Sequence, residues 1–258
     1  MKIAKTLVAA TAATALLACV VNAAPGQAAG EVPPPVGGGT VSKDIAGGTT
    51  TTVSAAPYVV QVSFDSGGTN GLCAGSQIAA TWVITAKHCN SASLRSVRLG
   101  TSYLGTGGAV RSVAARYPAP AGDVLLLKLS RPYYGSYVGL SSSFPATGTI
   151  ASVYGWGDQS EGSGAMSYYL KAAQVSVVWQ GVDNYGGPSV RTRSESGHTL
   201  SGDSGGPLIV NGKLAGVLST SDFLPGRNPT SYAGYYNNHA SVVRNLAWIT
   251  SVSGVGGS

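Results

Sequence analysis

Three short segments of the chain carry residues that together could perform acyl transfer. The glycine-rich loop Gly202–Pro207 presents Ser204 between small residues, so the backbone can turn tightly and leave the hydroxyl exposed. Successive N–H groups of such a loop can point into one concavity and stabilise an oxyanion. His88 follows a short apolar run, and Asp123 precedes another. Serine, histidine and aspartate would supply a nucleophile, a general base and a group that orients the base.

Each segment taken alone also has an ordinary interpretation. The loop could be a plain glycine/serine turn, the histidine could be structural or exposed, and the aspartate could be a turn or capping residue. Together they favour catalysis, because all three chemical roles are present in the chain order histidine, aspartate, serine.

The elements that must position these residues are short β-strands. From Ile45 onward, Val-rich apolar runs alternate with turns of Gly, Pro, Ser or Asn, which is typical of strands. The Asn-Gly pair at 211–212 predicts a hairpin turn, and residues 241–250 predict one helix with an apolar face. The fold class is therefore all-β with a C-terminal helix. The predicted strand runs are residues 58–64, 77–85, 97–99, 124–129, 149–154, 174–178, 208–210 and 213–219.

Composition excludes several classes of protein. The chain has 258 residues, of which 43% are hydrophobic and 10% are charged, so it is not an intrinsically disordered chain. The formal charge of +6 is spread along the sequence, so a basic patch for nucleic acid is not supported. The sequence carries no metal-ligand cluster, phosphate loop or cofactor motif, so we expect no metal and no cofactor.

The first 29 residues have the three parts of a secretory signal peptide. Lys2 and Lys5 begin it, an apolar run extends over residues 3–21, and small residues suited to cleavage follow. A membrane anchor is a weaker alternative, as is a lipoprotein cleavage box ending at Cys19, which Leu17 fits poorly. No later stretch reaches about eighteen apolar residues. We therefore expect secretion to the extracellular space without stable membrane association.

The cysteines agree with an oxidising compartment. If Cys19 leaves with the signal peptide, Cys73 and Cys89 remain, an even number. A disulfide between them would close a loop of 16 residues and contribute about 3 kcal/mol. A metal site is a poor alternative, because two cysteines cannot complete a tetrahedral shell.

Six segments carry a resemblance to a known family: Ile45–Gly48, Leu72–Ser76, Trp82–Cys89, Asp123–Leu129, Gly155–Gly157 and Gly202–Pro207. On these segments the region from Ile45 to about Ile249 resembles the trypsin/chymotrypsin-like serine proteases, in the form of a secreted bacterial member. The resemblance implies two antiparallel six-stranded β-barrels and a C-terminal helix, with the site in the cleft between the barrels. Barrel one would span about 45–140, barrel two about 141–240 and the helix about 241–251, within a protease domain at 45–258.

The resemblance implies a role for each matching residue in a serine endopeptidase. Ser204 would attack the scissile carbonyl, His88 would move the proton, and Asp123 would fix the histidine tautomer. The backbone N–H groups of Gly202 and Ser204 would form the oxyanion hole, and Ser219 would support Asp123. The half-cystines beside the histidine would match the family's disulfide.

The resemblance also implies synthesis as a zymogen. Asp203 matches the residue that pairs with a new α-amino group after activation, and its expected partner is the amino group of Ile45. We therefore expect residues 30–44 to be a Pro/Gly-rich propeptide that is cut after Asp44, which leaves 214 residues. Cleavage after Lys43 is the less suitable alternative, because it would put a charged residue into an apolar socket.

The predicted specificity pocket departs from the family pattern. His198 stands where a trypsin-like enzyme has aspartate, and Leu200 replaces a half-cystine. A Ser-Trp-Gly segment is replaced by Ser-Thr-Ser at 219–221. The predicted pocket residues are His198, Thr199, Ser201, Ser219, Thr220 and Ser221.

Such a donor-rich pocket could solvate a carboxylate, so cleavage after Asp or Glu is one interpretation. It would allow self-activation after Asp44, and Arg227 could reinforce the preference. The alternatives are a pocket that takes an apolar or aromatic side chain beside a neutral His198, or a broad specificity.

The expected partners are protein or peptide substrates and possible protein inhibitors, and the protein is expected to be a monomer. A catalytically inert binding homologue is the alternative of a different class.

Overall fold

The computed structural model describes residues 45–222 and 232–258 of the chain. Several predictions from the sequence therefore lie outside the described residues: the signal peptide 1–29, the propeptide 30–44, the cut after Asp44 or Lys43, Cys19 and Arg227.

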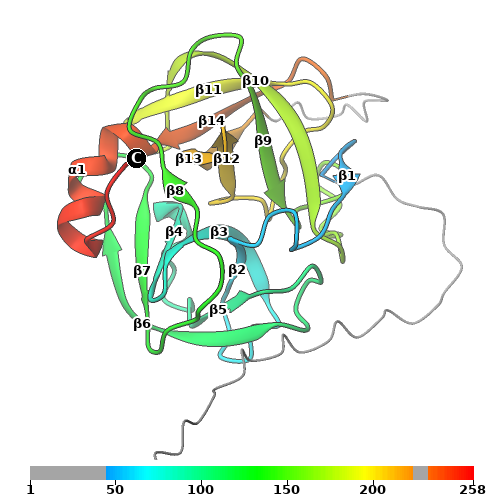
Figure 1. Ribbon diagram of the computed structural model, residues 1–258. Coiled ribbons are helices and arrows are strands. Elements are labelled where there is room, and N and C mark those ends of the chain that lie inside the picture. The colour runs from blue at the N-terminus through cyan, green and yellow to red at the C-terminus, as the bar shows by residue number, and fades with distance from the viewer. Residues whose placement is uncertain (1–44, 223–231) are drawn as a thin grey trace, which may run out of the picture. The chain divides into compact units, whose positions relative to one another are not determined.

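Six antiparallel strands close into a first barrel (Figure 1). The ring closes because its first strand, β2 (Val59–Ser63), pairs on one side with β3 (Gly71–Ala79) and on the other side with β5 (Ser96–Leu99), where Val62 is opposite Val97. In order around the barrel the strands are β2 (Val59–Ser63), β3 (Gly71–Ala79), β4 (Trp82–Thr85), β7 (Leu125–Leu129), β6 (Ala109–Pro118) and β5 (Ser96–Leu99).

Six further strands close a second barrel, because the strands at the two ends of this set of six also pair with each other. The two closed barrels confirm the predicted fold. In order around the second barrel the strands are β9 (Ile150–Gly155), β10 (Lys171–Val182), β11 (Pro188–Ser194), β14 (Tyr236–Ser241), β13 (Lys213–Ser221) and β12 (Pro207–Val210). Two short strands extend this sheet: β1 (Thr49–Thr50) pairs with β10, and β8 (Gly139–Leu140) runs parallel to β13.

The start of the domain belongs to the second barrel. Thr49 pairs with Ala172 of β10, and the completely buried side chain of Ile45 packs in the apolar core of the second barrel. The prediction that barrel one begins at Ile45 is therefore wrong, since its strands span 59–129. The physical reason is that the apolar side chain of Ile45 is removed from water by packing against core residues of the second barrel.

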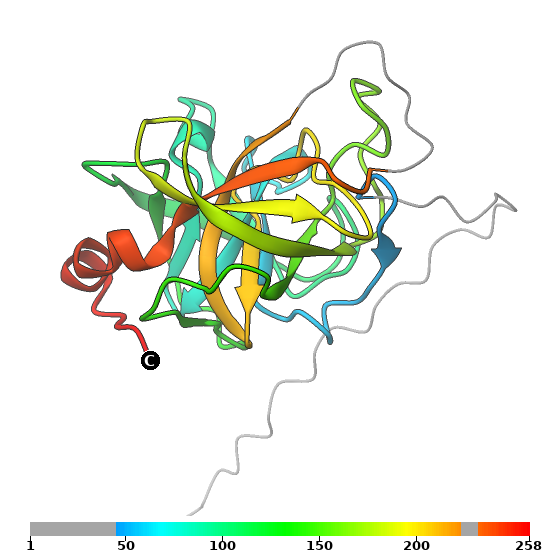
Figure 2. The ribbon, with the colours of Figure 1, turned by 90° about the horizontal axis from the view of Figure 1, so that it is seen from above.

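The C-terminal helix is present as α1 (Val242–Ser253), which ends two residues later than predicted. Ser241 caps its first turn by accepting a hydrogen bond from the N–H of Arg244. Val242 and Ile249 are buried, as their helical spacing predicts. Figure 2 shows α1 and β1 at opposite ends of the described domain. No helix of the described ranges is long and apolar enough to cross a membrane.

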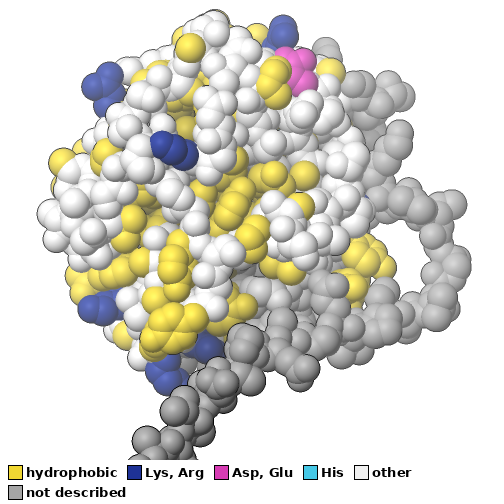
Figure 3. All heavy atoms as spheres, viewed as in Figure 1, with side chains coloured by type: hydrophobic (Ala, Val, Ile, Leu, Met, Phe, Trp, Pro, Cys, Tyr) yellow, Lys and Arg dark blue, Asp and Glu magenta, His cyan; other side chains and the backbone are white. Residues whose placement is uncertain are grey.

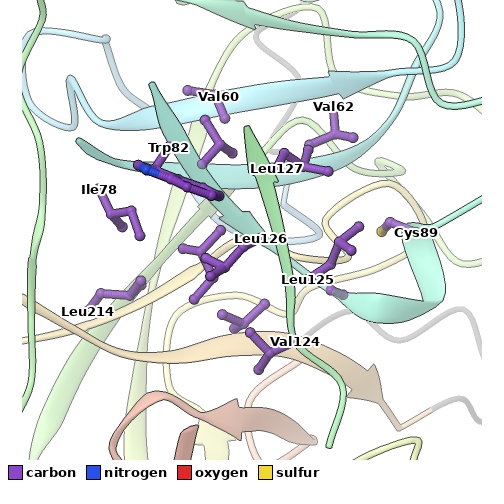
Figure 4. Packing of buried hydrophobic residues seen from close by; sticks show 14 of the residues in the cluster. Val60, Val62, Ile78, Trp82, Cys89, Val124, Leu125, Leu126, Leu127 and Leu214 are labelled. Atoms are coloured by element: carbon purple, nitrogen blue, oxygen red, sulfur yellow. The ribbon is translucent and has the colours of Figure 1, made fainter. Parts of the chain in front are cut away.

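A buried apolar cluster fixes the strands from which the predicted site residues emerge. Trp82 of β4 and Leu126 of β7 belong to this cluster, together with Leu214 of β13 from the second barrel (Figure 4). β4 and β7 are direct neighbours, with Thr85 opposite Leu125. The ends of these two strands therefore place His88 and Asp123 side by side.

Candidate active site

His88 lies in a single 3₁₀ turn, η1 (Lys87–Cys89), directly after β4. Cys73 and Cys89 form a disulfide with an S–S distance of 2.00 Å, which ties this turn to β3. The three potential metal ligands Cys73, His88 and Cys89 lie within 4.8 Å of one another. Both sulfur atoms are in the disulfide, so the cluster does not fit a metal ion.

The carboxyl group of Asp123 is completely buried just before β7. Its Oδ1 accepts the backbone N–H of His88 at 2.9 Å, and its Oδ2 lies 2.7 Å from His88 Nδ1. The Ser219 hydroxyl also donates to Oδ2, at 2.6 Å. Burial opposes ionisation, but the hydrogen bonds from His88 and Ser219 outweigh it and lower the pKa of Asp123 below its ordinary value. The ionised carboxylate holds the proton of His88 on Nδ1 and leaves Nε2 as an acceptor.

The half-buried Ser204 lies in the loop before β12 and is fixed by both barrels. Its carbonyl accepts the N–H of Ala74 from β3 at 2.8 Å and lies 3.9 Å from the Cys89 sulfur. The N–H of Gly205 donates to Leu218 of β13 at 2.8 Å. These backbone contacts place Ser204 next to Cys89, in the turn that carries His88, and within the described residues the serine hydroxyl makes no hydrogen bond.

The loop around Ser204 requires glycine at two positions. Gly202 has φ +95° and Gly205 has φ +80°, both in the left-handed region. A Cβ on Gly205 would lie 2.1 Å from the hydroxyl of Thr85. Backbone carbonyls accept the N–H groups of Asp203, Gly205 and Gly206, whereas no group in the described part of the chain accepts those of Gly202 and Ser204. These two N–H groups are thus available to an oxyanion.

Asp203 is completely buried. Its Oδ1 accepts the N–H of Gly157 at 2.7 Å and its Oδ2 accepts the N–H of Leu200 at 3.0 Å. Burial raises the pKa of Asp203 to about 7 in spite of these two donors. A Cβ on Gly155 or Gly157 would lie within 2.4 Å of this carboxyl group, which explains why the segment 155–157 has glycine on both sides of a tryptophan.

A cavity of about 220 Å³ opens beside Ser204. Of the residues predicted to line the pocket, it includes Ser201, Ser219, Thr220 and Ser221. Two acidic residues, Glu161 and Asp222, also line it and were missed from the sequence. Asp222 directly follows the predicted pocket strand, a signal that could have revealed it, whereas Glu161 lies far away in the chain. The other lining residues are Gly162, Leu200, Ser204 and Leu218.

His198 lies behind the lining of this cavity, so the prediction that it lines the pocket is corrected. Its Nε2 lies 3.1 Å from the carbonyl oxygen of Asp222, and its Nδ1 lies 3.0 Å from the hydroxyl of Ser194. A carbonyl oxygen can only accept a hydrogen bond, so the His198 proton lies on Nε2 and is donated to Asp222. The ring stacks on Tyr232 at a centroid distance of 5.9 Å, and burial lowers the pKa of His198. The histidine is therefore neutral and has no donor left for a substrate.

Thr199, the second residue predicted to line the pocket, also lies behind it. Its hydroxyl donates to the side-chain oxygen of Asn237 at 2.9 Å and lies 2.7 Å from the Ser221 hydroxyl. Both contacts are internal to the wall. Thr199 therefore orients a lining residue instead of facing the cavity.

Comparisons with known proteins agree on one family. The family model for trypsin matches residues 45–249. Trypsin delta of Drosophila melanogaster is 33% identical over 223 residues, covering 78% of this chain and 85% of that protein. Trypsin alpha-4 of Lucilia cuprina is 30% identical over 225 residues, covering 78% and 84%. These relatives are insect proteins, so the bacterial origin stays a prediction.

Among solved structures, human heparin binding protein superimposes with a TM-score of 0.68 at 23% identity. The match covers 83% of this chain and 99% of that protein. At this level of identity the likeness is one of fold.

Proposed function

Since the chain belongs to the trypsin family of serine endopeptidases, we propose that Ser204, His88 and Asp123 hydrolyse peptide bonds through an acyl-enzyme. The observation that carries this assignment is the contact of 2.7 Å between His88 Nδ1 and the buried carboxylate of Asp123. It keeps the proton on Nδ1, so Nε2 can accept the proton of the serine hydroxyl.

The proposed reaction has two halves. Ser204 Oγ attacks the scissile carbonyl while His88 Nε2 takes its proton and passes it to the leaving amine. Water then attacks the acyl-enzyme with the same histidine as base, and the serine regains its proton. The N–H groups of Gly202 and Ser204 stabilise the oxyanion in both halves; loss of one such donor typically costs about 10²–10³ in rate.

We propose that the enzyme is activated by cleavage after Asp44. The support comes from two buried groups: the Ile45 side chain in the second-barrel core and the Asp203 carboxyl group, whose charged form burial disfavours. A new α-amino group on Ile45 would compensate the carboxylate and hold the loop that carries the oxyanion donors.

The pocket favours a basic over an acidic side chain in this proposal. Glu161 and Asp222 both line it, whereas no Lys or Arg does so among the described residues. Arg191 lies 3.9 Å from Asp222 and balances that charge in part. His198, on which the interpretation as an acidic pocket depended, has both ring nitrogens engaged. With this preference the enzyme would not cut after Asp44 itself, so another protease would activate it.

We place the enzyme outside the cell, acting on proteins or peptides as a monomer. The predicted signal peptide and the disulfide support secretion. On the face shown in Figure 3 the Lys and Arg side chains are dispersed, which gives no support to a nucleic-acid partner.

The first test is cleavage of a peptide library by the domain that starts at Ile45, with Ser204→Ala as control. We expect cleavage that the substitution abolishes, and a preference for Lys, Arg or neutral polar residues over Asp and Glu. Efficient cleavage after Asp or Glu would refute the proposed pocket. Failure of the Ser204 hydroxyl to react with a serine-directed phosphonate would indicate an inert binding homologue.

The second test changes the charge of the pocket. We expect the combined Glu161→Gln and Asp222→Asn variant to lower the kcat/KM ratio of basic to acidic substrates about tenfold, which is about 1.4 kcal/mol. Glu195→Gln is a matched control, because this carboxylate contacts Ser176 and Arg193 and does not line the pocket. An unchanged ratio in the double variant would refute the role of these carboxylates.

A further inference from the structure

The tip of the β10–β11 hairpin, residues 183–187, contacts the proposed catalytic aspartate. Asp183 is buried, and its Oδ1 accepts the N–H groups of Tyr185 and Gly187, each at 2.9 Å. Its Oδ2 accepts the backbone N–H of Asp123, also at 2.9 Å. One carboxyl group thus both folds the tip and binds a residue of the first barrel. Neither the sequence motifs nor the triad geometry assigns it a role.

The same tip also fixes the side-chain end of Asp123. The backbone N–H of Asn184 donates to the hydroxyl oxygen of Ser219 at 2.9 Å. That hydroxyl donates in turn to Asp123 Oδ2 at 2.6 Å. Asp123 is therefore oriented at two points by adjacent residues of a hairpin in the other barrel.

Two glycines allow the approach of the tip to the aspartate. A Cβ on Gly187 would lie 2.4 Å from the Cα of Gly122 and 2.7 Å from Asp183 Oδ2. Gly122 has φ +79° and faces the same carboxyl group. Any side chain at Gly187 would therefore push the tip away from the segment that carries Asp123.

A third contact joins the tip to the histidine segment. The ammonium group of Lys87 lies 4.2 Å from the ring centroid of Tyr185, and it donates to the carbonyl of Ala119 at 3.1 Å. Lys87 directly precedes His88. The tip thus contacts both the residue that precedes His88 and the backbone of Asp123.

We infer that Asp183 is a positioning residue for catalysis, which holds the Asp123 carboxylate in the geometry that orients His88. This inference rests on the proposed triad. A displacement of about 1 Å in a catalytic group can cost about 10² in rate. Because Asp183 acts on the orientation of the base and does not line the pocket, its loss lowers kcat and leaves KM nearly unchanged.

The test compares Asp183→Ala and Asp183→Asn in the mature domain. We expect Asp183→Ala to lower kcat on the order of 10- to 100-fold with KM within about twofold. The low-field proton resonance of His88 Nδ1–H should shift or broaden. Asp183→Asn, whose amide oxygen can still accept the N–H of Asp123, should recover part of the rate. Gly187→Ala should lower kcat in the same way, since its φ carries no left-handed strain.

Val182→Ala is the matched control, because this side chain directly precedes Asp183 in the chain and is 62% exposed. An unchanged kcat and low-field resonance in folded Asp183→Ala would overturn the inference. So would a rise of KM alone, or an equal loss in Val182→Ala. If Asp183→Ala does not fold, Asp183→Asn and Gly187→Ala decide by the same readouts. A parent domain without activity and without the resonance would instead refute the proposed triad.

Discussion

The buried carboxyl group of Asp203 should make the stability of the intact chain depend on pH. In the intact chain the nitrogen of Ile45 belongs to a peptide bond and carries no charge. The pKa of Asp203 is raised by burial from its ordinary 3.8 to about 7. The unfolded chain therefore releases this proton near pH 3.8, whereas the folded chain releases it near pH 7.

This difference destabilises the folded chain as the pH rises. Between about pH 4 and 7 the folded state binds more protons than the unfolded state, so the free energy of unfolding falls with increasing pH and levels off above 7. A rise from 3.8 to about 7 is about three decades in proton affinity. At about 1.4 kcal/mol for each decade, Asp203 costs the intact chain about 4 kcal/mol at pH 8.

Two buried histidines act in the opposite direction and must be separated from this effect. Burial lowers the pKa of His198, and it lowers the pKa of His239 to about 3. The folded state therefore resists protonation of these rings, and their contribution raises stability as the pH increases towards their ordinary pKa of 6.5. A comparison with Asp203→Asn at each pH cancels the histidines, because both proteins contain them.

The assay is urea unfolding at several pH values from 4 to 8, with Ser204→Ala in every protein to prevent cleavage. We expect Asp203→Asn to gain about 3 to 4 kcal/mol relative to the intact parent chain over this range. A difference that is independent of pH, or that changes in the other direction, would refute the reasoning. In the domain that starts at Ile45 the gain should shrink, because an α-amino group then favours the charged carboxylate. An equal gain there would exclude the ion pair.

Three further outcomes are expected. Replacing Cys73 and Cys89 by alanine should lower the free energy of unfolding by about 3 kcal/mol, measured by denaturation without reductant; an unchanged midpoint would contradict this. Ser219→Ala removes a hydrogen bond to the buried carboxylate of Asp123, so it should destabilise the domain by about 1.5–3 kcal/mol and, if the proposed triad holds, lower kcat. Gly205→Ala would put a Cβ 2.1 Å from the Thr85 hydroxyl, so thermal unfolding should show a large loss of stability, and wild-type activity would refute the loop geometry.

The sequence alone was sufficient for the fold class and for the types of residues in the site. Short Val-rich runs separated by turns predict strands, because that pattern depends only on local periodicity. The helix at the C-terminus followed from the same kind of local pattern. The His88–Asp123 contact and the disulfide agree with predictions made from motifs that lie next to strands. Motifs of this kind have a local signature, so they can be recognised without coordinates.

Contacts between distant segments could not be obtained in this way. The segment that starts at Ile45 belongs to the second barrel because the Ile45 side chain is buried in the core of that barrel, and no local pattern in the sequence indicates this packing. The charge of the pocket depended on Glu161 and Asp222, which lie 61 positions apart in the chain. Both ring nitrogens of His198 are engaged within the fold, so its residue type alone suggested the wrong role.

The contact between Asp183 and Asp123 shows most directly why contacts between distant segments cannot be predicted from local sequence patterns. In the sequence Asp183 is one aspartate in a turn, 60 positions away from Asp123. The pairing of β10 with β11 places Asp183 at the tip of the hairpin. Gly122 and Gly187 have no side chains, so the tip can approach closely enough for the Asp183 carboxyl group to accept the N–H of Asp123. Residue types and local periodicity determined which chemistry the chain could perform. Strand register and burial, which are set by long-range packing, decided which side chains face the site and which donors remain available to a substrate.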